Sequence, residues 1–438
     1  MIVNGIFNYI NRINDNIVFI TPHLYSVGDA SEILMFGLIK AKHDNKKLFI
    51  LSPYDSIFLF GKQICNNALF LLESKYIYKQ NIVISTISKI FVTIIILPSR
   101  LIDRIMNIFD KQLAERRVVP LVGYDELWAT SNEIRNGFSW NIVDQKNWFE
   151  RINYIYDLSI DKNKLSALPG KMADLGIDPS SWFVCLHVRE SGFRKDEGRR
   201  EYRNSSIFNY LPAIIEIIKA GGIVVRMGDS TMTPLPEIKN LIDYPFTEHK
   251  SALMDLQLIR SCRFFIGTDS GIMDTAKMFR KDTLITNMVG WISAYPLRKK
   301  DRGIYKYVFH KPSHRYLTLQ EILNDDWSMQ ALFGRISDDY ELVENTPEDI
   351  KDGVLEYLDC HNNNNFSLSE NQIKLNYKRV KVAVKIFEKF RLNEYVGTDE
   401  EVSIRYKIAS RINNLMDGSI CNSYINKYLH TSFSDSRK

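Results

Sequence analysis

Three short apolar segments constrain the fold of this chain more than any other part of its sequence. They are Phe183–Leu186, Ile223–Met227 and Phe264–Gly267, and each is followed by charged or small residues. Segments this short, rich in β-branched and aromatic residues, are typical of strands buried on both faces of a parallel sheet. Between the first two segments, apolar residues at helical spacing end at Gly221-Gly222, which is typical of the end of a helix. A second helical pattern spans Ser251–Cys262, so the predicted order is β-α-β-α-β. The sequence therefore predicts a doubly wound α/β domain.

Polar side chains gather where these predicted strands end. They are His187, Arg189, Glu190, Arg226, Asp229, Asp269, Ser270 and Gly271. Ligands of doubly wound sheets bind at the carboxyl ends of the strands, so these residues form a candidate site. A helix that begins at Ser270-Gly271 would point its first amides toward this edge, which suits a phosphate. Simple capping of that helix by Ser270 or Asp269 is the alternative.

Two arginines at neighbouring strand ends, Arg189 and Arg226, favour an anionic ligand. Burying two guanidinium groups destabilises a protein unless an anion pairs with them. The alternative is internal pairing with carboxylates, for which Glu190, Asp229 and Asp255 are candidates. Arg203-Asn204 follows the charged segment Arg194–Glu201, which we expect to close over a ligand.

A second βαβ pattern opens the chain. A strand over Ile17–Ile20 precedes a helix that begins near Asp29 and ends before Asn45, and Leu48–Leu51 is the next strand. Asp29 is either the N-cap of that helix or a general base that faces the cleft between the domains. The two roles are compatible, because a capping carboxylate also points outward from the strand ends. The sequence thus predicts a first domain of the same class as the central one.

The segments that follow are less clear from periodicity. Leu59–Leu72 is predicted to be helical, and Ile82–Pro98 is read as buried core by default. Ser99–Arg117 is a basic amphipathic helix, which suits either an anionic membrane surface or packing on the protein's own core. No segment reaches the roughly 20 apolar residues that a membrane span needs, and the first residues do not form a signal peptide.

Composition and missing motifs exclude several classes of function. A net charge of +5 over 438 residues argues against a general nucleic-acid binder. The five cysteines are scattered and indicate a reducing compartment. The sequence contains no H-x-x-H, Cys/His cluster or D-x-D, so no metal is expected. It contains no dinucleotide fingerprint, P-loop or nucleophile elbow, so no cofactor is expected.

Local motifs resemble those of known glycosyltransferases. Ser26-Val27-Gly28-Asp29 resembles the loop of bacterial heptosyltransferases, whose Asp is the catalytic base. Gly267–Gly271 resembles their D-[ST]-G helix start, which binds donor phosphate, although this chain has Asp274 where that family has His. His187–Glu190, with the sequence HVRE, resembles the H-x-R motif of fucosyltransferases, whose Arg neutralises the donor diphosphate.

The order of motifs also resembles that of a group of bacterial glycosyltransferases. In this chain the motifs are His187–Glu190, Arg203-Asn204, Gly221–Asp229, Asp243-Tyr244, Ser270-Gly271 and Asn287. The resemblance implies the GT-B architecture, in which two Rossmann-like doubly wound domains face a cleft. It implies an acceptor domain over 1–165, a donor domain over 166–340 and a helical C-terminal extension over 341–438.

The resemblance also implies an activity. The implied activity is metal-independent transfer of a sugar from a nucleotide-sugar donor to a glycan or lipid-linked acceptor, with inversion at the anomeric carbon. It would serve synthesis of a bacterial surface polysaccharide such as O-antigen or capsule. The implied catalytic residues are Asp29, His187 and Glu190. The implied donor-binding residues are Arg189, Arg203, Asn204, Arg226, Asp229, Asp243, Asp269, Ser270 and Gly271.

We expect a cytoplasmic enzyme, held at the inner membrane face through 99–117. A nucleotide-sugar epimerase or hydrolase and a non-catalytic glycan-binding scaffold are the alternatives.

Overall fold

The computed structural model describes residues 16–20, 27–51, 66–90, 157–160, 168–192, 201–290, 296, 298–333, 336–391 and 418–430. The chain forms two compact units. Unit 1 comprises Met1–Asn141 and Glu150–Ser166, and unit 2 comprises Ile142–Phe149 and Ala167–Lys438. The predicted domain bounds stay predictions, and residues 341–438 belong to the same unit as the central sheet.

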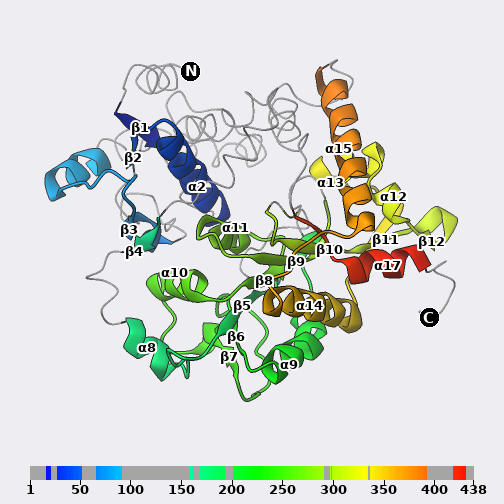
Figure 1. Ribbon diagram of the computed structural model, residues 1–438, viewed down its shortest axis with the longest axis horizontal. Helices are drawn as coiled ribbons and strands as arrows, with labels where there is room; N and C mark the ends of the chain where they lie inside the picture. The colour runs from blue at the N-terminus through cyan, green and yellow to red at the C-terminus, as the bar shows by residue number, and fades with distance from the viewer. Residues whose placement is uncertain are drawn as a thin grey trace, which may run out of the picture. The chain divides into compact units, whose positions relative to one another are not determined.

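Unit 1 contains the βαβ pattern predicted at the start of the chain (Figure 1). Strands β1 (Ile17–Ile20) and β2 (Lys47–Ile50) pair in parallel, and α2 (Val27–His43) connects them. Gly37 lets α2 approach the sheet, because a Cβ there would lie 2.9 Å from Leu48 Cδ1. The two-residue strands β3 (Leu72–Glu73) and β4 (Ser159–Ile160) form an antiparallel pair.

Three expectations for unit 1 need correction. Helix α2 begins at Val27, so Asp29 lies within its first turn and is not its N-cap. The described part of 59–72 is a 3-10 helix, η2 (Asn67–Leu71), followed by β3, and not an α-helix. Asn66 is the N-cap of η2, since its side chain accepts from Ala68 N at 2.9 Å. Residues 82–90 are helical but expose apolar side chains rather than burying them.

Unit 2 is built on a seven-stranded sheet in which every neighbouring pair is parallel. Its strands are β5 (Phe183–His187), β6 (Ile223–Arg226), β7 (Leu241–Asp243), β8 (Phe265–Thr268), β9 (Thr283–Met288), β10 (Arg302–Tyr305) and β14 (Ser419–Ile420). The strand order is β14-β10-β9-β8-β5-β6-β7. Renumbered from β5, the first six strands follow the order 3-2-1-4-5-6 of dinucleotide-binding sheets. The switch point of that order lies between β5 and β8.

Helices cover both faces of this sheet. The longer ones are α9 (Leu211–Lys219), α10 (Ala252–Ser261), α11 (Gly271–Met278), α14 (Pro347–Asn362), α15 (Glu370–Arg391) and α17 (Asn422–His430), and α8 (Leu168–Asp174) precedes β5. Helix α14 packs against α9 and α17, whereas α10 packs against α11 (Figure 1). Helix α14 begins with a capping box, which Thr346 and Asp349 form around Pro347. The parallel α/β class predicted for this unit is therefore correct.

The C-terminal part of the chain is not purely helical. A three-stranded antiparallel sheet, in the order β12-β11-β13, consists of β11 (Tyr307–His310), β12 (Arg315–Tyr316) and β13 (Tyr340–Val343). The short helices α12 (Leu319–Ile322) and α13 (Asp325–Phe333) lie between β12 and β13 in sequence. Strand β14 pairs with β10 and so extends the central sheet. Among the described residues, no helix is long and apolar enough to cross a membrane.

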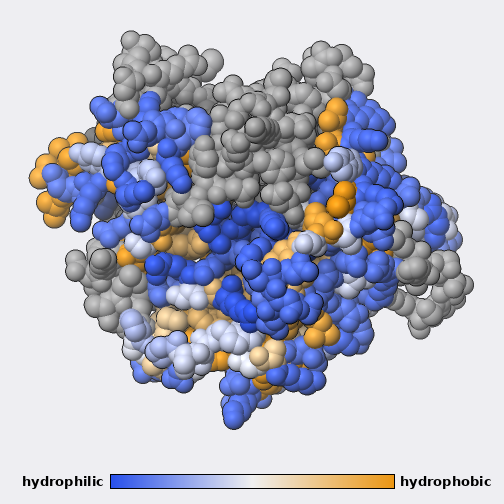
Figure 2. Space-filling model, in the orientation of Figure 1, coloured by the Kyte–Doolittle hydropathy of each residue, from blue (hydrophilic) through white to orange (hydrophobic). Residues whose placement is uncertain are grey.

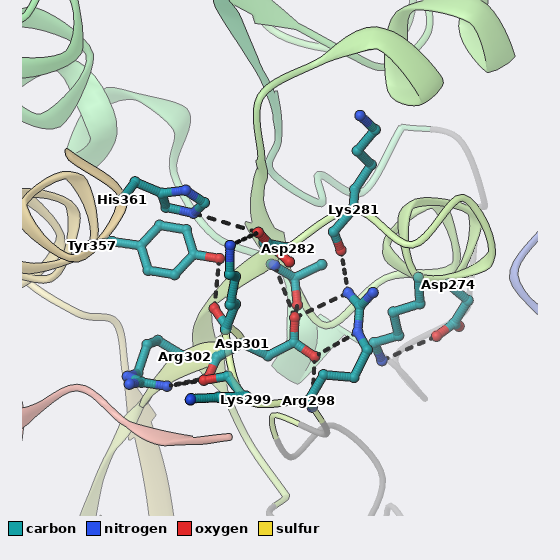
Figure 3. A network of polar contacts seen from close by, with 12 residues as sticks. Asp274, Lys281, Asp282, Arg298, Lys299, Asp301, Arg302, Tyr357 and His361 are labelled. Atoms are coloured by element: carbon teal, nitrogen blue, oxygen red, sulfur yellow. Dashed lines mark hydrogen bonds and ion pairs between the residues drawn. The ribbon is translucent and has the colours of Figure 1, made fainter. Parts of the chain in front are cut away.

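A buried ionic network fixes the amino-terminal ends of β9 and β10 (Figure 3). Asp301 has no exposed surface and accepts from Arg298 Nε at 3.2 Å and from Thr283 N and Oγ1 at 3.0 Å. Burial alone would raise the pKa of Asp301, but the charge and hydrogen bonds of Arg298 hold that pKa below its usual value. From α14, Tyr357 donates to Lys300 O at 2.9 Å. The basic run at 298–302 is therefore partly structural, and not simply solvated surface, because Arg302 is also buried.

Candidate functional site

The switch point brings the ends of β5 and β8 into close contact. Gly267 on β8 pairs with His187 on β5, and a Cβ at Gly267 would lie 2.6 Å from the His187 carbonyl oxygen. Only glycine allows this approach. Just beyond this pair, Arg189 N, two residues after His187, donates to Thr268 Oγ1 at 3.0 Å, and Thr268 is fully buried. The two loops that leave these strands are thus tied together at the carboxyl edge.

His187 and Ser270 form a pair at this edge. His187 Nδ1 and Ser270 Oγ are 3.0 Å apart, and the tautomer decides which of them donates. Among the described residues, His187 Nε2 has no hydrogen-bond partner. Burial, and then the positive charge of Arg226, lower the pKa of His187 to about 3. The imidazole is therefore neutral near pH 7 and presents one nitrogen for a further contact.

The first turn of α11 is open to a ligand. Ser270 occupies the N-cap position, as predicted, but its hydroxyl makes no capping hydrogen bond and pairs with His187 instead. Met273 N donates to Ser270 O, whereas the amides of Gly271 and Ile272 have no partner among the described residues. Unpaired amides at a helix N-terminus attract anions, because the helix dipole adds to their own partial charge.

The Arg203-Asn204 turn holds both strand-end loops. The Arg203 guanidinium donates to Asp269 O from Nε at 2.9 Å and lies 3.1 Å from Asp269 Oδ1. The Asp269 carboxylate raises the pKa of Arg203, so the guanidinium stays charged. Asn204 Oδ1 accepts from Arg189 Nε at 3.1 Å, and Ser205 N donates to Arg189 O. These two predicted donor-binding residues therefore contact other site residues.

Arg226 is engaged within the protein. It has no exposed surface, and it donates to Asp243 Oδ1 at 2.8 Å and to Glu190 Oε1 at 2.9 Å. Glu190 Oε2 also accepts from Thr233 N and Oγ1 at 2.8 Å. Internal pairing was the alternative to ligand binding, with Glu190, Asp229 and Asp255 as the candidate partners. Of these, Glu190 pairs with Arg226, whereas the second partner is Asp243. This pairing fixes the loop after β5 against the loop after β6.

The GD turn after β6 is shaped by its own residues. Gly228 has φ +148°, and a Cβ there would lie 2.0 Å from Met232 Sδ, so this position requires glycine. Asp229 accepts from Thr231 N at 2.8 Å and from Thr231 Oγ1 at 2.5 Å. The predicted donor-binding carboxylate of Asp229 therefore closes its own turn.

Other predicted residues lie elsewhere. Asp29 is in unit 1, and its side chain is outside the described residues, as are all of 99–117. Tyr244 is buried in the 3-10 helix η5 (Tyr244–Phe246) after β7. Asn287 has φ +52° and exchanges hydrogen bonds of 2.8 Å with Asn345. No group of three or more His, Cys, Asp or Glu residues in the described part of the chain is arranged to hold a metal ion.

Sequence reasoning missed one cation at this edge. Lys306 follows β10 directly, is almost fully buried, and donates from Nζ to Asn204 O at 2.6 Å. The sequence signal for Lys306 is its position directly after the short apolar segment Gly303-Ile304-Tyr305. Because this segment directly follows the basic residues at 298–302, the sequence does not show β10 clearly as a strand.

Unit 2 is thus a doubly wound α/β domain whose switch point brings together His187, the loop of Arg189 and the N-terminus of α11. No family model matches this chain, and no curated protein matches it. Among solved structures it is similar to the crystal structure of a glycosyl transferase of family 9 from Veillonella parvula DSM 2008. The identity is 10%, the TM-score is 0.35, and the match covers 64% of this chain and 82% of that chain. A similarity this weak identifies neither fold nor activity.

Proposed function

We propose that this chain is a glycosyltransferase whose nucleotide-sugar donor binds at the carboxyl edge of the unit 2 sheet. The observation that supports this most is the switch point, where the unpaired amides of Gly271 and Ile272 lie beside His187 and the loop of Arg189. Amides at a helix start and an arginine suit a diphosphate. The motif order shared with bacterial glycosyltransferases supports the same ligand.

In this proposal each residue at the edge has one role. The first amides of α11 receive the donor phosphates, and Arg189 offsets the negative charge that grows on the leaving diphosphate. Neutral His187 forms a hydrogen bond to the donor through Nε2. Arg226 has no exposed surface, so we assign it, with Glu190 and Asp243, to holding the loops in place. Arg203 positions Asp269 and Ser270 in the same way.

The remaining assignments come from the resemblance. The architecture would be GT-B, with unit 1 as the acceptor domain and unit 2 as the donor domain. Asp29 would remove the proton from the acceptor hydroxyl, and the transfer would be inverting and independent of metal. The acceptor would be a glycan or a lipid-linked sugar of a bacterial surface polysaccharide, used at the inner face of the membrane.

Calorimetric titration with nucleoside diphosphates and nucleotide sugars tests this proposal. Arg189→Ala should weaken binding about tenfold to a hundredfold, because a hydrogen bond to a charged group contributes about 1.5–3 kcal/mol. The matched control is Arg263→Ala, since Arg263 precedes β8 at the opposite edge and lies over the Trp182 ring. Binding should persist in a strong chelator. Equal affinities of Arg189→Ala and wild type would remove the assigned donor site.

Mass spectrometry of the reaction products separates the alternatives. Transfer to an added acceptor supports the proposal. Epimerisation or hydrolysis of the nucleotide sugar without an acceptor would identify the rival enzyme class. Absence of nucleotide binding by the wild-type chain would leave the glycan-binding scaffold.

A further inference from the structure

Lys306 is a buried cation whose surroundings do not balance its charge. It lies at the carboxyl end of β10, on the same edge of the sheet as the switch point, and is only 4% exposed. Its ammonium group has three donors, and one of them is used by Asn204 O at 2.6 Å. Among the described residues, no carboxylate lies within 4.0 Å of Lys306 Nζ.

The nearest acidic group acts from a distance and has other partners. Burial lowers the pKa of Lys306, and the charge of Glu344 offsets this only in part. Glu344 Oε2 already accepts from Ser206 N at 2.8 Å and from Asn209 Nδ2 at 3.1 Å. A buried cation with one hydrogen bond and no ion pair destabilises a folded protein. Such a residue suits a site where an anion arrives from outside.

The same turn connects Lys306 to the strand-end arginine. Asn204 accepts from Lys306 through its backbone oxygen and from Arg189 Nε through its side-chain oxygen. The two cations therefore both contact Asn204. In addition, Ser205 N donates to Arg189 O, which keeps the turn close to the loop after β5.

We propose that Lys306 is an anion-binding residue of the carboxyl edge, and that it holds a diphosphate together with Arg189, which also contacts Asn204. The anion is the counter-ion that Lys306 does not have among the described residues. This inference rests on the proposed function in assigning the diphosphate to a nucleotide-sugar donor. It adds a residue outside the motifs that carry the family resemblance, and it extends the anion site from β5 and β8 toward β10.

Calorimetric titration with inorganic pyrophosphate tests the role of Lys306. Lys306→Met should weaken binding about tenfold or more, as expected for loss of a charge-assisted hydrogen bond, and Lys306→Arg should retain more affinity. Lys281→Met is the matched control. Lys281 Nζ donates to a backbone oxygen, that of Cys262, at 2.8 Å, but it precedes β9 and lies at the opposite edge. The control should bind pyrophosphate as the wild type does.

The melting temperature of the unliganded variant separates this role from a structural one. Removing an uncompensated buried charge should leave the melting temperature of Lys306→Met unchanged or higher. A lower melting temperature with unchanged pyrophosphate affinity would overturn the proposal. Wild-type binding of pyrophosphate but of no nucleotide would overturn the proposed function and leave Lys306 as an anion ligand. Wild-type binding of neither probe would overturn both.

Discussion

The two ring nitrogens of His187 have different surroundings, and this limits the chemistry of that residue. Nδ1 pairs with Ser270, while Nε2 has no partner among the described residues. With a pKa lowered to about 3, the ring is a weak base and is not in the protonated imidazolium form at pH 7. His187 is therefore suited to hydrogen bonding with the donor. Removal of the acceptor proton is left to another group, for which we propose Asp29.

Replacement of Asp29 by Asn tests that assignment. Asp29 lies in the first turn of α2, where Asn preserves its shape. Turnover should fall about a hundredfold or more through loss of the general base, whereas donor affinity and melting temperature should stay constant. Glu32→Gln removes a charge one turn later on the same helix and serves as the control. An Asp29→Asn enzyme that turns over as fast as the control would exclude Asp29 as the base.

At the site, the sequence predicts which residues reach the edge but not what they contact. His187, Arg189 and Ser270 were placed at strand ends, and the structure brings their backbones together at the switch point. Arg226 was placed there too, yet its partners Glu190 and Asp243 follow β5 and end β7, the strands on either side of β6. Strand order is a property of the folded sheet, so the spacing along the chain does not contain it.

At the scale of whole elements, local signals worked where they were complete. Helix α10 has Ser251 as its N-cap and Cys262 as its C-cap, as its sequence indicates. Strand β7 is not predicted because it has only three residues, and β10 is not predicted because it begins at Arg302, within the basic run 298–302. For 82–90, helical periodicity is real, but Ile82 is 83% exposed. Apolar composition predicts burial only when another element is available to cover the surface.

Helix α14 carries a histidine that should make stability depend on pH. The ring of His361 stacks on Phe264 at 4.7 Å and meets Tyr357 at 4.8 Å and Phe366 at 4.9 Å between centroids. Burial, followed by the charge of Arg263, lowers its pKa to about 4. Between that value and the unfolded value of about 6.5, the unfolded chain binds more protons. Stability is thus lost as the pH falls through this window.

We therefore expect His361→Phe to reduce the pH dependence of stability. Phenylalanine keeps the aromatic contacts and removes the titrating group. Calorimetric melting temperatures at pH 7, 6 and 5 should fall less for His361→Phe than for the wild type. The exposed His43, at the end of α2, provides the control variant His43→Phe. Parallel curves for wild type and His361→Phe would show that His361 does not contribute to the effect.

For the molecule as a whole, we propose that the exposed apolar helix 82–90 contacts a membrane surface. Ile82, Val83 and Ile87 are each at least 60% exposed, and apolar surface is visible at the left of Figure 2. In sequence, this helix precedes the basic segment 99–117, whose charge complements anionic lipid. An apolar face followed by cations is typical of proteins that bind membrane surfaces.

Flotation with anionic vesicles at low salt measures this binding. The wild-type chain should float with the vesicles. The double variant Ile82→Asn, Ile87→Asn should float less, because each substitution removes an exposed apolar side chain. Phe208 and Phe246 of unit 2 are also exposed, so Phe208→Asn, Phe246→Asn is the matched control. If the wild type stays at the bottom of the gradient, or if both double variants float equally, the membrane assignment is wrong.

The pairing of β14 with β10 bears on how this protein is made. Arg302 and Gly303 align with Ser419 and Ile420, which follow α14 and α15 in sequence. During synthesis, β10 leaves the ribosome long before its outer neighbour exists. Until then its free backbone groups can pair with another nascent chain. Contacts between distant residues also form slowly, because a long loop must close first. A growing chain therefore has an interval in which chaperones can protect it from aggregation.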